Sequence, residues 1–324
     1  MTRWWNYVRF FRALLDPRKD VCPAQIEGLG LLAVKIAQMY AVRADLIGFQ
    51  KSRQLRGFFE DARPVPPGEI EGRFLKAAPA SLLSALRSWD RTPAAAASIG
   101  QVHRGTLRDG TEVAIKIVKA DAREEFQSQV RSLRRFLRIV IAFYPKLGRL
   151  ADPLGVLASV ERSTLRELDL RSEVEGLDVL RRLRDEGAEQ LPHLSQLEFP
   201  KVYREFSGPD LLVSEWRSEP SLNDLIARRD FSYEQVLALF RIHGYFLFVR
   251  GTFHGDLHPG NVLYQDGRFV FLDNANVESA PPELTRGILG MLSALGDDDI
   301  TTAAECIAST STKPLPQTSR DRLL

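Results

Sequence analysis

The segment that most constrains this chain of 324 residues is FHGDLHPGNVLYQDGRFVFLD at residues 253–273. Asp256 is followed five residues later by Asn261, and Asp273 comes directly after an apolar run typical of a buried strand. An aspartate in such a loop can accept a hydroxyl proton, and carboxylate and amide oxygens are ligands that Mg²⁺ prefers. The segment therefore predicts a catalytic loop with Asp256 as the base, followed by a metal-binding strand end with Asn261 and Asp273 as ligands.

A second segment predicts a β-hairpin. An alanine run begins after Pro93, and β-favouring residues follow it, so we expect a turn that joins two strands rather than a helix. The dipeptide at 109–110 is Asp-Gly, a strong two-residue hairpin signal. It lies between the apolar stretches 102–107 and 112–118, which we expect to be the two paired strands.

Lys116 is the single charge within the apolar run of the second strand. A buried lysine is costly unless a carboxylate pairs with it, so we expect an ion pair with Glu167, Asp169 or Glu173 of the next acidic segment. Two simpler alternatives stay open at this point. Lys116 can point to solvent from an edge strand, and the acidic residues can form a solvated helix face balanced by nearby arginines.

The composition is that of an ordinary soluble globular protein, with 44% hydrophobic and 27% charged residues. The formal net charge of +2 gives no reason to expect a nucleic-acid partner. Cys22 and Cys306 lie far apart, which disfavours a disulfide framework and a paired-cysteine zinc site. No run approaches the roughly 20 apolar residues of a spanning helix. We therefore expect a cytoplasmic protein with no transmembrane segment.

Residues 1–15 read MTRWWNYVRFFRALL and combine aromatic residues with three arginines. A basic amphipathic helix of this kind can lie in a membrane interface, which would place the protein peripherally on the inner face of a membrane. The alternative is a terminal helix that docks its aromatic side chains on the protein's own surface.

The remaining pattern predicts mostly helices with a few strands. We expect a linker at 63–68, strands at 199–203 and 211–216, and helices at 23–40, 74–86, 123–146, 154–184, 221–227, 233–249 and within 282–324. The end of the strand at 211–216 is expected to form a hinge whose backbone can bond an adenine edge.

Four separated features together resemble the ABC1/AarF/UbiB/ADCK group of atypical protein-kinase-like proteins. In chain order they are KIAQ at 35–38, AAASIGQVH at 95–103, Glu167, Asp169 and Glu173 in the acidic segment, and HGDLHPGN at 254–261 with Asp273. The alanine-rich segment is specific to that group, whereas aminoglycoside-type phosphotransferases carry loops similar to HGDLHPGN. The resemblance covers roughly residues 24 to 300.

The resemblance implies an α+β, two-lobed protein-kinase-like fold with an N-terminal helical extension. The implied domains are the extension at 1–65, an N-lobe with the alanine-rich loop and inserted helices at 66–216, and a C-lobe at 217–324. Because the sequence ends soon after Asp273, we expect a shortened C-terminal lobe.

The resemblance also implies ATP or ADP and Mg²⁺ as ligands. Lys116, held by Glu173, would contact the nucleotide phosphates, and Asn261 and Asp273 would hold the metal. The other implied nucleotide-binding residues are Ala95, Ala96, Ala97, Ser98, Gly100 and Gln101 of the loop and Glu215, Trp216 and Arg217 of the hinge. The implied cleft residues, which would hinder access by a protein substrate, are Lys35, Gln38, Glu167 and Asp169.

The implied activity is ATP hydrolysis or phosphorylation of a small or lipid-like molecule in support of ubiquinone or other isoprenoid-lipid metabolism. Two departures from the family pattern matter. Ala37 replaces a glycine, and Asp273 is followed by Asn and Ala instead of Phe and Gly. The second departure keeps open a nucleotide-sensing pseudokinase scaffold. A small-molecule phosphotransferase of the aminoglycoside type is the third alternative.

Overall fold

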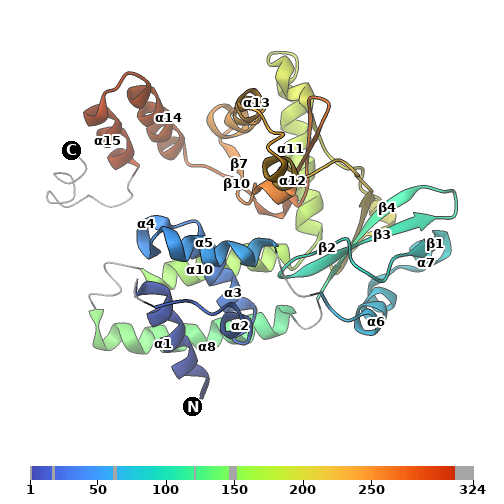
Figure 1. Cartoon of the computed structure of the whole chain (residues 1–324), viewed down its shortest axis with the longest axis horizontal. Helices are drawn as coiled ribbons and strands as arrows, with labels where there is room; N and C mark the ends of the chain where they lie inside the picture. The colour runs from blue at the N-terminus through green and yellow to red at the C-terminus, as the bar shows by residue number, and fades with distance from the viewer. Residues whose placement is uncertain (1, 17–18, 61–63, 120–121, 146–151, 311–324) are drawn as a thin grey trace. The chain divides into compact units, whose positions relative to one another are not determined.

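The computed structural model describes residues 2–16, 19–60, 64–119, 122–145 and 152–310. The chain divides into two compact units, drawn in Figure 1. The first unit holds Met1–Glu173 and Pro200–Ser218, and the second unit holds Val174–Phe199 and Glu219–Leu324. Both contain helices and strands, which confirms the predicted α+β class.

The first unit contains an antiparallel sheet in the order β1-β3-β4-β6, with β2 paired to β3. Its strands are β1 (Leu86–Trp89), β2 (Ala95–Ala96), β3 (Gly100–Leu107), β4 (Glu112–Val118) and β6 (Leu211–Glu215). The predicted hairpin is confirmed, because β3 and β4 pair around a turn in which Gly110 has φ of 90°. The alternate residues Val113, Ile115 and Ile117 are buried against α6 (Pro67–Ala77) and α7 (Ala80–Ala85).

A helical layer forms the rest of the first unit. Its members are α1 (Thr2–Leu15), α2 (Pro23–Glu27), α3 (Leu31–Ala41), α4 (Ala44–Ile47), α5 (Phe49–Glu60), α8 (Ala122–Phe143) and α10 (Pro153–Glu167). They share one apolar core, in which Leu14, Leu32 and Phe126 are fully buried. The terminal helix α1 is therefore part of the folded layer.

Two predicted helices of this unit are broken in the structure. The helix expected at 23–40 is interrupted at Gly30, whose φ of 94° is left-handed and whose α-carbon packs against Gln129. The helix expected at 74–86 ends before Pro79, because proline cannot continue a helix, and its last residue starts β1. The predicted linker at 63–68 starts outside the described residues, and α6 begins at Pro67.

Two further predictions about elements are wrong. The helix expected at 154–184 is two helices, α10 and α11 (Arg171–Gly187). The strand expected at 199–203 is absent, because only Val202 makes an isolated bridge, to Ser214, and a 3₁₀ turn, η2 (Arg204–Phe206), follows. A two-residue strand, β5 (Leu197–Glu198), lies just before that segment.

The second unit carries two small sheets among helices. Strand β9 (Arg268–Phe271) pairs with β8 (Val262–Gln265) in a hairpin and runs parallel to β5, and β7 (Thr252–His254) pairs with β10 (Val277–Ser279). The helical elements are α11, η1 (Pro192–Gln196), α12 (Leu222–Arg228), α13 (Tyr233–Gly244), a π-helical turn η3 (Tyr245–Val249), η4 (Pro259–Asn261), η5 (Asn274–Asn276), α14 (Pro282–Gly296) and α15 (Ile300–Ser309). Phe246, Phe269 and Phe271 are fully buried.

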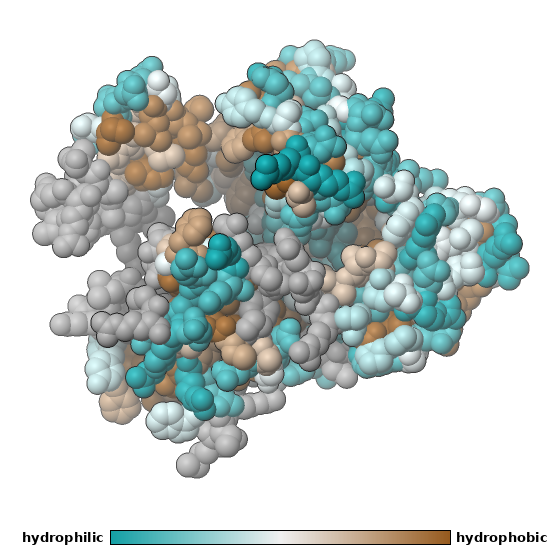
Figure 2. All heavy atoms as spheres, viewed as in Figure 1, coloured by the Kyte–Doolittle hydropathy of each residue, from teal (hydrophilic) through white to brown (hydrophobic). Residues whose placement is uncertain are grey.

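Small residues close the α14–α15 hairpin. A methyl group on Gly287 or Gly290 would meet Cys306 at 2.9 or 2.8 Å, so the two helices approach closely. The larger apolar residues of the pair then face outward, and Figure 2 shows hydrophobic residues gathered there. The most exposed of them are Leu289, Leu292, Leu295 and Ile300. Within the described residues, no helix is long and apolar enough to cross a membrane.

Candidate functional site

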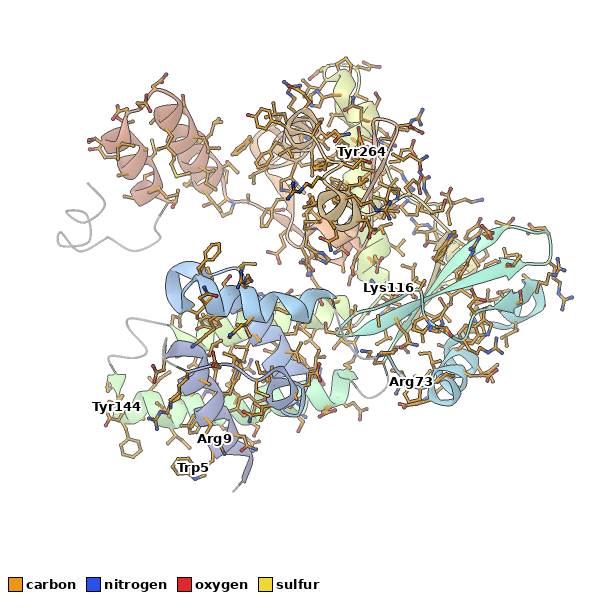
Figure 3. All side chains as sticks on the ribbon, viewed as in Figure 1. Trp5, Arg9, Arg73, Lys116, Tyr144 and Tyr264 are labelled. Atoms are coloured by element: carbon orange, nitrogen blue, oxygen red, sulfur yellow. The ribbon has the colours of Figure 1, made fainter. Side chains whose placement is uncertain are left out.

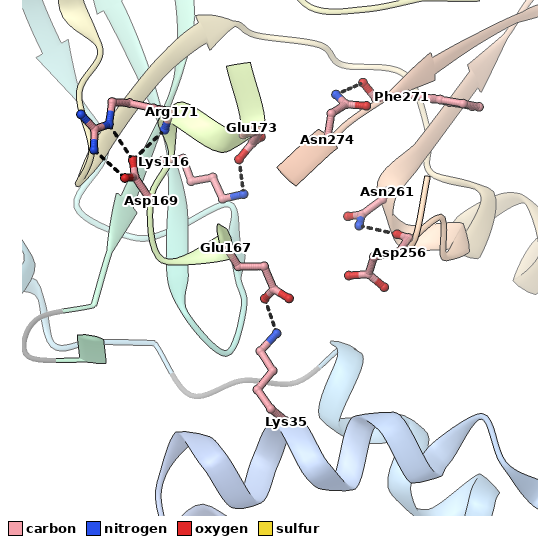
Figure 4. Close-up of polar contacts among 10 residues, drawn as sticks. All are labelled: Lys35, Lys116, Glu167, Asp169, Arg171, Glu173, Asp256, Asn261, Phe271 and Asn274. Atoms are coloured by element: carbon pink, nitrogen blue, oxygen red, sulfur yellow. Dashed lines mark hydrogen bonds and ion pairs between the residues drawn. The ribbon is translucent and has the colours of Figure 1, made fainter. Parts of the chain in front are cut away.

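Lys116 lies in the middle of the first unit's sheet, where β4 is paired on both sides. Its backbone partners are Val102 on β3 and Leu212 on β6, so it is not on an edge strand. Its Nζ donates to a carboxylate oxygen of Glu173 at 2.6 Å, and both side chains are nearly buried, at 12% and 11% exposed. Figure 4 shows this pair. The structure thus provides the carboxylate that a buried lysine needs.

The helical pattern is interrupted between α10 and α11, and the acidic residues on the two sides of this interruption contact different partners. Leu168 and Leu170 are both 1% exposed, so this short connection is anchored in the interior. The side chain of Asp169 accepts from the backbone amide of Arg171 at 3.2 Å, which caps the start of α11. The broken helix therefore corrects the predicted single helix and separates Glu167 from Glu173.

Asp169 is held by a second contact to the same residue. The guanidinium of Arg171 donates to both Asp169 oxygens, at 2.9 and 2.6 Å. This hydrogen bonding by Arg171 lowers the pKa of Asp169, partly opposed by burial. The Asp169 carboxylate is therefore held by Arg171 and by Arg123, whose guanidinium lies 3.9 Å away.

Lys35 of α3 forms an ion pair with Glu167, the last residue of α10, as Figure 4 shows. Ser163 also donates to Glu167, at 3.3 Å. The lysine and the carboxylate are 12% and 10% exposed. The structure therefore joins two of the four predicted cleft residues directly, and Gln38 follows one turn later on the Lys35 helix.

The alanine-rich segment forms a tight hairpin, as predicted, instead of a helix. Ala95 and Ala96 pair with β3, and the amide of Ala97 donates to the carbonyl of Gly100 at 2.8 Å. A methyl group at Gly100 would lie 2.7 Å from the carbonyl oxygen of Ile117, so only glycine fits beside β4.

Gln101 has an inward side chain that the sequence did not reveal. Its Oε1 accepts from the amide of Val65 at 2.8 Å, and its Nε2 lies 2.9 Å from Nε2 of His103. The other ring nitrogen of His103 lies 2.7 Å from the carbonyl oxygen of Asp90. Because the amide of Gln101 donates, the His103 proton belongs on Nδ1. The buried Gln101 side chain is therefore used in the fold, and any contact with a nucleotide falls to the backbone.

The predicted hinge begins at Glu215, the last residue of β6, and continues to Arg217. The amide of Glu215 donates to the carbonyl of Lys201 at 2.8 Å, and that of Trp216 donates to Glu112 at 3.3 Å. The guanidinium of Arg104 lies 5.4 Å from the centre of the Trp216 ring. These contacts use two hinge amides within the first unit, so other backbone groups near Arg217 would have to meet an adenine edge.

The predicted catalytic loop lies in the second unit and is shaped by its own backbone. The amide of His258 donates to the carbonyl of Asp256 at 3.0 Å, and Nδ2 of Asn261 donates to the same oxygen at 3.2 Å, as Figure 4 shows. The amide of Gly255 donates to the carbonyl of Asn276 at 2.6 Å. These bonds bring Asp256 and Asn261 together at the end of β7.

His254 is a buried side chain that contacts the backbone of this loop. Its Nδ1 accepts from the amide of Asp256 at 3.2 Å, and its ring is 4% exposed. Burial lowers the pKa of His254 to about 4, and the nearby charge of Asp273 only partly opposes this shift. The imidazole is therefore neutral near pH 7 and acts as a hydrogen-bond acceptor that orients the Asp256 backbone.

Asp273 follows β9, as predicted, and adopts a left-handed backbone with φ of 50°. Aspartate tolerates this region better than most residues. Gly176 of α11 packs against the next residue so closely that a methyl group there would overlap the backbone oxygen of Asn274. Sequence reasoning missed Gly176, although a lone glycine inside a helical pattern is a signal of close packing.

The predicted site residues thus divide between the two units. The first unit joins Lys116 to Glu173 and Lys35 to Glu167, and the second joins Asp256 to Asn261. The first set consists of two lysine–glutamate ion pairs, and the Lys116 pair lies beside the tight alanine-rich hairpin. The second set consists of side chains on a loop that carry oxygen atoms. Each unit carries elements that the sequence predicted for a kinase-like protein.

The comparison with known families agrees with that class. The ABC1 atypical kinase-like domain family matches residues 58–307, and the chain belongs to this family. An uncharacterized Synechocystis protein, slr0889, is 28% identical over 89% of this chain and 72% of its own length. Rv0647c of Mycobacterium tuberculosis is 30% identical over 78% of this chain and 51% of its own. The probable protein kinase UbiB of Vibrio vulnificus is 29% identical over 81% of this chain.

The chain spans about half the length of the last two relatives, 51% and 48%. Among solved structures, the Mycobacterium tuberculosis protein Rv3197, determined with erythromycin, aligns over 99% of this chain and 78% of its own with a TM-score of 0.58 and 22% identity. That likeness supports the kinase-like fold predicted from the sequence. The chain is therefore a kinase-like protein of the ABC1 family, and it is similar to UbiB over about half of that protein's length.

Proposed function

We propose that this chain binds ATP together with Mg²⁺ and hydrolyses it or transfers its terminal phosphoryl group to a small or lipid-like acceptor. The observation that carries the proposal is the nearly buried pair of Lys116 and Glu173. A lysine held in this way, next to a backbone hairpin, suits a role on the phosphates of a nucleotide. ADP would occupy the same position after hydrolysis.

The loop of the alanine-rich hairpin would cover the phosphates. Its backbone amides take the part that glycine-rich loops play in ordinary kinases, although alanines reach fewer left-handed conformations. In this proposal Ala95, Ala96, Ala97, Ser98 and Gly100 contribute through the main chain, and the backbone near Arg217 meets the adenine.

The donor set of the second unit fits Mg²⁺. Nδ2 of Asn261 donates to the Asp256 carbonyl, which leaves Oδ1 as the amide atom available to a metal. The Asp273 carboxylate supplies a second hard oxygen, as this cation prefers. When bound, the metal would neutralise charge that develops on the transferred phosphoryl group. Asp256 would orient the acceptor hydroxyl or a water molecule.

The acceptor class is proposed from the family. One relative is described as the probable protein kinase UbiB, and we extend to this chain a role in ubiquinone or other isoprenoid-lipid metabolism. The ion pair of Lys35 and Glu167 supports a small acceptor, because it fixes the N-terminal helix α3 beside the acidic connection that leads to Glu173. A lipid acceptor would place the work at the inner face of a membrane.

Replacement of Asp256 by asparagine tests the catalytic part. We expect Asp256→Asn to lower ATP turnover by about 100-fold or more while ATP still binds, because a positioned base contributes on that order. Asp266→Asn is the matched control, since Asp266 lies in the exposed β8–β9 turn. Equal turnover by Asp256→Asn and the control would exclude Asp256 as the base.

A second candidate is a nucleotide-sensing scaffold with little chemistry. It is favoured by the sequence after Asp273, where Asn274 is buried and Ala275 takes the place of a flexible glycine. This reading expects capture of a partner that depends on ATP while no ADP forms. Capture that is indifferent to nucleotide would exclude it.

A third candidate, an antibiotic-type phosphotransferase, draws on the erythromycin complex of Rv3197. The alanine-rich hairpin and the Lys35 helix speak against it, because aminoglycoside-type enzymes lack them. Mass analysis of erythromycin after incubation with the chain, ATP and Mg²⁺ decides the point, since a phosphorylated product would be required.

A further inference from the structure

Helix α14 has two sides of different character. Gly287 and Gly290 lie on the side that packs closely against Cys306 of α15. Leu292 lies on the opposite side, because it is five residues from Gly287 and two from Gly290, and each residue turns a helix by about 100°. The leucine is 49% exposed. The small residues of α14 are therefore used against α15, and the larger side chain faces outward.

Leu289 and Leu295 extend the outer side of α14 along the helix. They lie three residues before and after Leu292, and they are 52% and 44% exposed. We define the leucine stripe as Leu289, Leu292 and Leu295. Figure 3 shows side chains projecting from the α14–α15 hairpin, and Figure 2 shows that hydrophobic residues gather there. Three half-exposed leucines in a row on one helix are typical of a surface that contacts another protein.

Charged residues of opposite sign flank the leucine stripe. Arg286 lies one turn before it, and Asp297 follows it and begins an acidic run at 297–299. Arg286 and Asp297 are 11 positions apart, which is about three turns, so they lie on the same side of the helix. The stripe therefore has an arginine at one end and aspartates at the other.

Both flanking charges can take a partner from outside the chain. Arg286 contacts Glu283 of its own helix at 3.4 Å, but both side chains are at least 69% exposed, so this pair contributes little. Within the part of the chain that the structure describes, Asp297 forms no ion pair. Neither charge is thus held firmly by the fold.

A second copy of the chain complements this pattern when the two α14 helices run antiparallel. A two-fold axis beside Leu292 places that leucine against its counterpart. It also brings each Arg286 to Asp297 of the second copy, because these residues lie six and five positions from Leu292. Parallel helices would instead bring two acidic runs together. We propose that the leucine stripe pairs two copies of this chain in an antiparallel homodimer.

The helix dipole favours the same orientation. The N-terminal end of α14 carries positive partial charge, and in the antiparallel dimer it lies beside the acidic run of the second copy. The C-terminal end carries negative partial charge and lies beside Arg286 of the second copy. These exposed charges fix the orientation of the two helices, and the leucines provide most of the attraction.

The homodimer is expected to be weak. One stripe of three leucines is smaller than the roughly 800 Å² per partner that a stable interface buries. We therefore expect a dissociation constant on the order of 10 µM or higher, so that the chain is monomeric when dilute and dimeric when concentrated.

Sedimentation equilibrium of the full chain tests the association. The concentrations run from about 1 to 300 µM, on both sides of the expected dissociation constant. The expected mass is that of one chain at the low end, and it approaches that of two chains at the high end. The mass of one chain across the whole range would overturn the proposal. The assay needs no nucleotide, so its outcome does not depend on the proposed function.

Leu292→Glu tests the leucine stripe. The change sets two like charges against each other at the axis, so the dissociation constant should rise at least about tenfold. The matched control is Leu75→Glu on α6, where the leucine is 57% exposed, and it should associate like the unaltered chain. Thermal melting shows whether both variants fold, and equal association by the two would contradict the stripe as the interface.

A charge exchange tests the antiparallel pairing. Arg286→Glu alone and Asp297→Lys alone should each weaken association by about threefold or more, because like charges then meet. The double variant Arg286→Glu/Asp297→Lys should restore association to within about twofold, because the pair forms again with its charges reversed. The single effects should fade in about 1 M salt, where exposed charges are screened. A double variant as weak as the two losses combined would overturn the antiparallel dimer.

Discussion

Gly176 on α11 packs directly against the backbone of Asn274, the residue that follows the proposed metal ligand Asp273. A methyl group at position 176 would overlap the Asn274 carbonyl oxygen and meet Val277 at 3.1 Å. Helix α11 also begins two residues before Glu173, the partner of Lys116. Helix α11 therefore carries both the partner of Lys116 and the glycine against which the turn after Asp273 packs.

This packing predicts that Gly176→Ala shifts the turn at Asp273 and lowers the free energy of unfolding by about 1–3 kcal/mol, as overpacking usually does. The matched control is Gly72→Ala on α6, where the added methyl group meets nothing within 4 Å. The control should be neutral or stabilising by up to about 1 kcal/mol, because alanine favours helices. Urea unfolding measures both, and equal effects would contradict the packing argument.

The pairing of Lys116 and Glu173 predicts coupled effects on nucleotide affinity. Lys116→Met should weaken ATP binding at least tenfold, and Glu173→Gln should weaken it as well, because the lysine then loses the group that positions it. The double variant should be no worse than Lys116→Met alone. Isothermal calorimetry checks this, and simple addition of the two losses would mean that the residues act independently.

Lys51 caps the C-terminus of α1 from inside the protein. Its Nζ donates to the backbone oxygens of Ala13, Leu14 and Asp16 at 2.6, 3.2 and 2.6 Å. Lys51→Met would leave these acceptors unsatisfied and should lower the free energy of unfolding by about 2–4 kcal/mol. Chemical denaturation of this variant and of the exposed control Lys19→Met gives the comparison, and equal stability would refute the cap.

His103 predicts a dependence of stability on pH. Burial is the main cause that lowers its pKa, and the bond to the Asp90 carbonyl partly opposes it. Below pH about 6.5 the unfolded chain takes up a proton that the folded state resists, so stability falls as pH decreases. The slope for one such group is at most about 1.4 kcal/mol per pH unit. Protonation of His103 would also turn its Nε2 into an N–H donor, and this donor would face the Nε2 donor of Gln101.

The measurement is the free energy of unfolding at pH 7 and pH 5 for the natural chain and for His103→Gln. The natural chain should lose more stability between these values than the variant does. Other buried histidines titrate equally in both proteins and cancel in the difference. The same loss in both proteins would show that His103 does not titrate on unfolding.

Local signals predicted the elements that depend on short-range chemistry. The turn at Asp109 and Gly110 defined the β3–β4 hairpin, and Pro93 argued correctly against a helix in the alanine run. Helix breaks were predicted less well. Gly30 and the connection at 168–170 interrupt periodic patterns because of contacts with Gln129 and with the core, which lie far away in sequence.

The acidic segment shows the same limit within the site. The sequence indicated that one acidic residue would pair with Lys116, but it did not indicate which one. Because α10 ends at Glu167, Glu173 lies on the next helix and pairs with Lys116, whereas Glu167 pairs with Lys35. Gln101 was a candidate for the nucleotide, and its side chain instead bonds Val65 and His103. The roles of these residues in nucleotide binding stay predictions.

The measurement that tests the central claim most directly is thermal unfolding with ATP, in the presence and absence of Mg²⁺. Ligand at a hundred times its dissociation constant adds about 2.7 kcal/mol to stability, so the melting temperature should rise by several degrees. We predict a rise that requires Mg²⁺ and is lost in Lys116→Met. An unchanged melting temperature with ATP and Mg²⁺ at millimolar concentration would contradict a working nucleotide site.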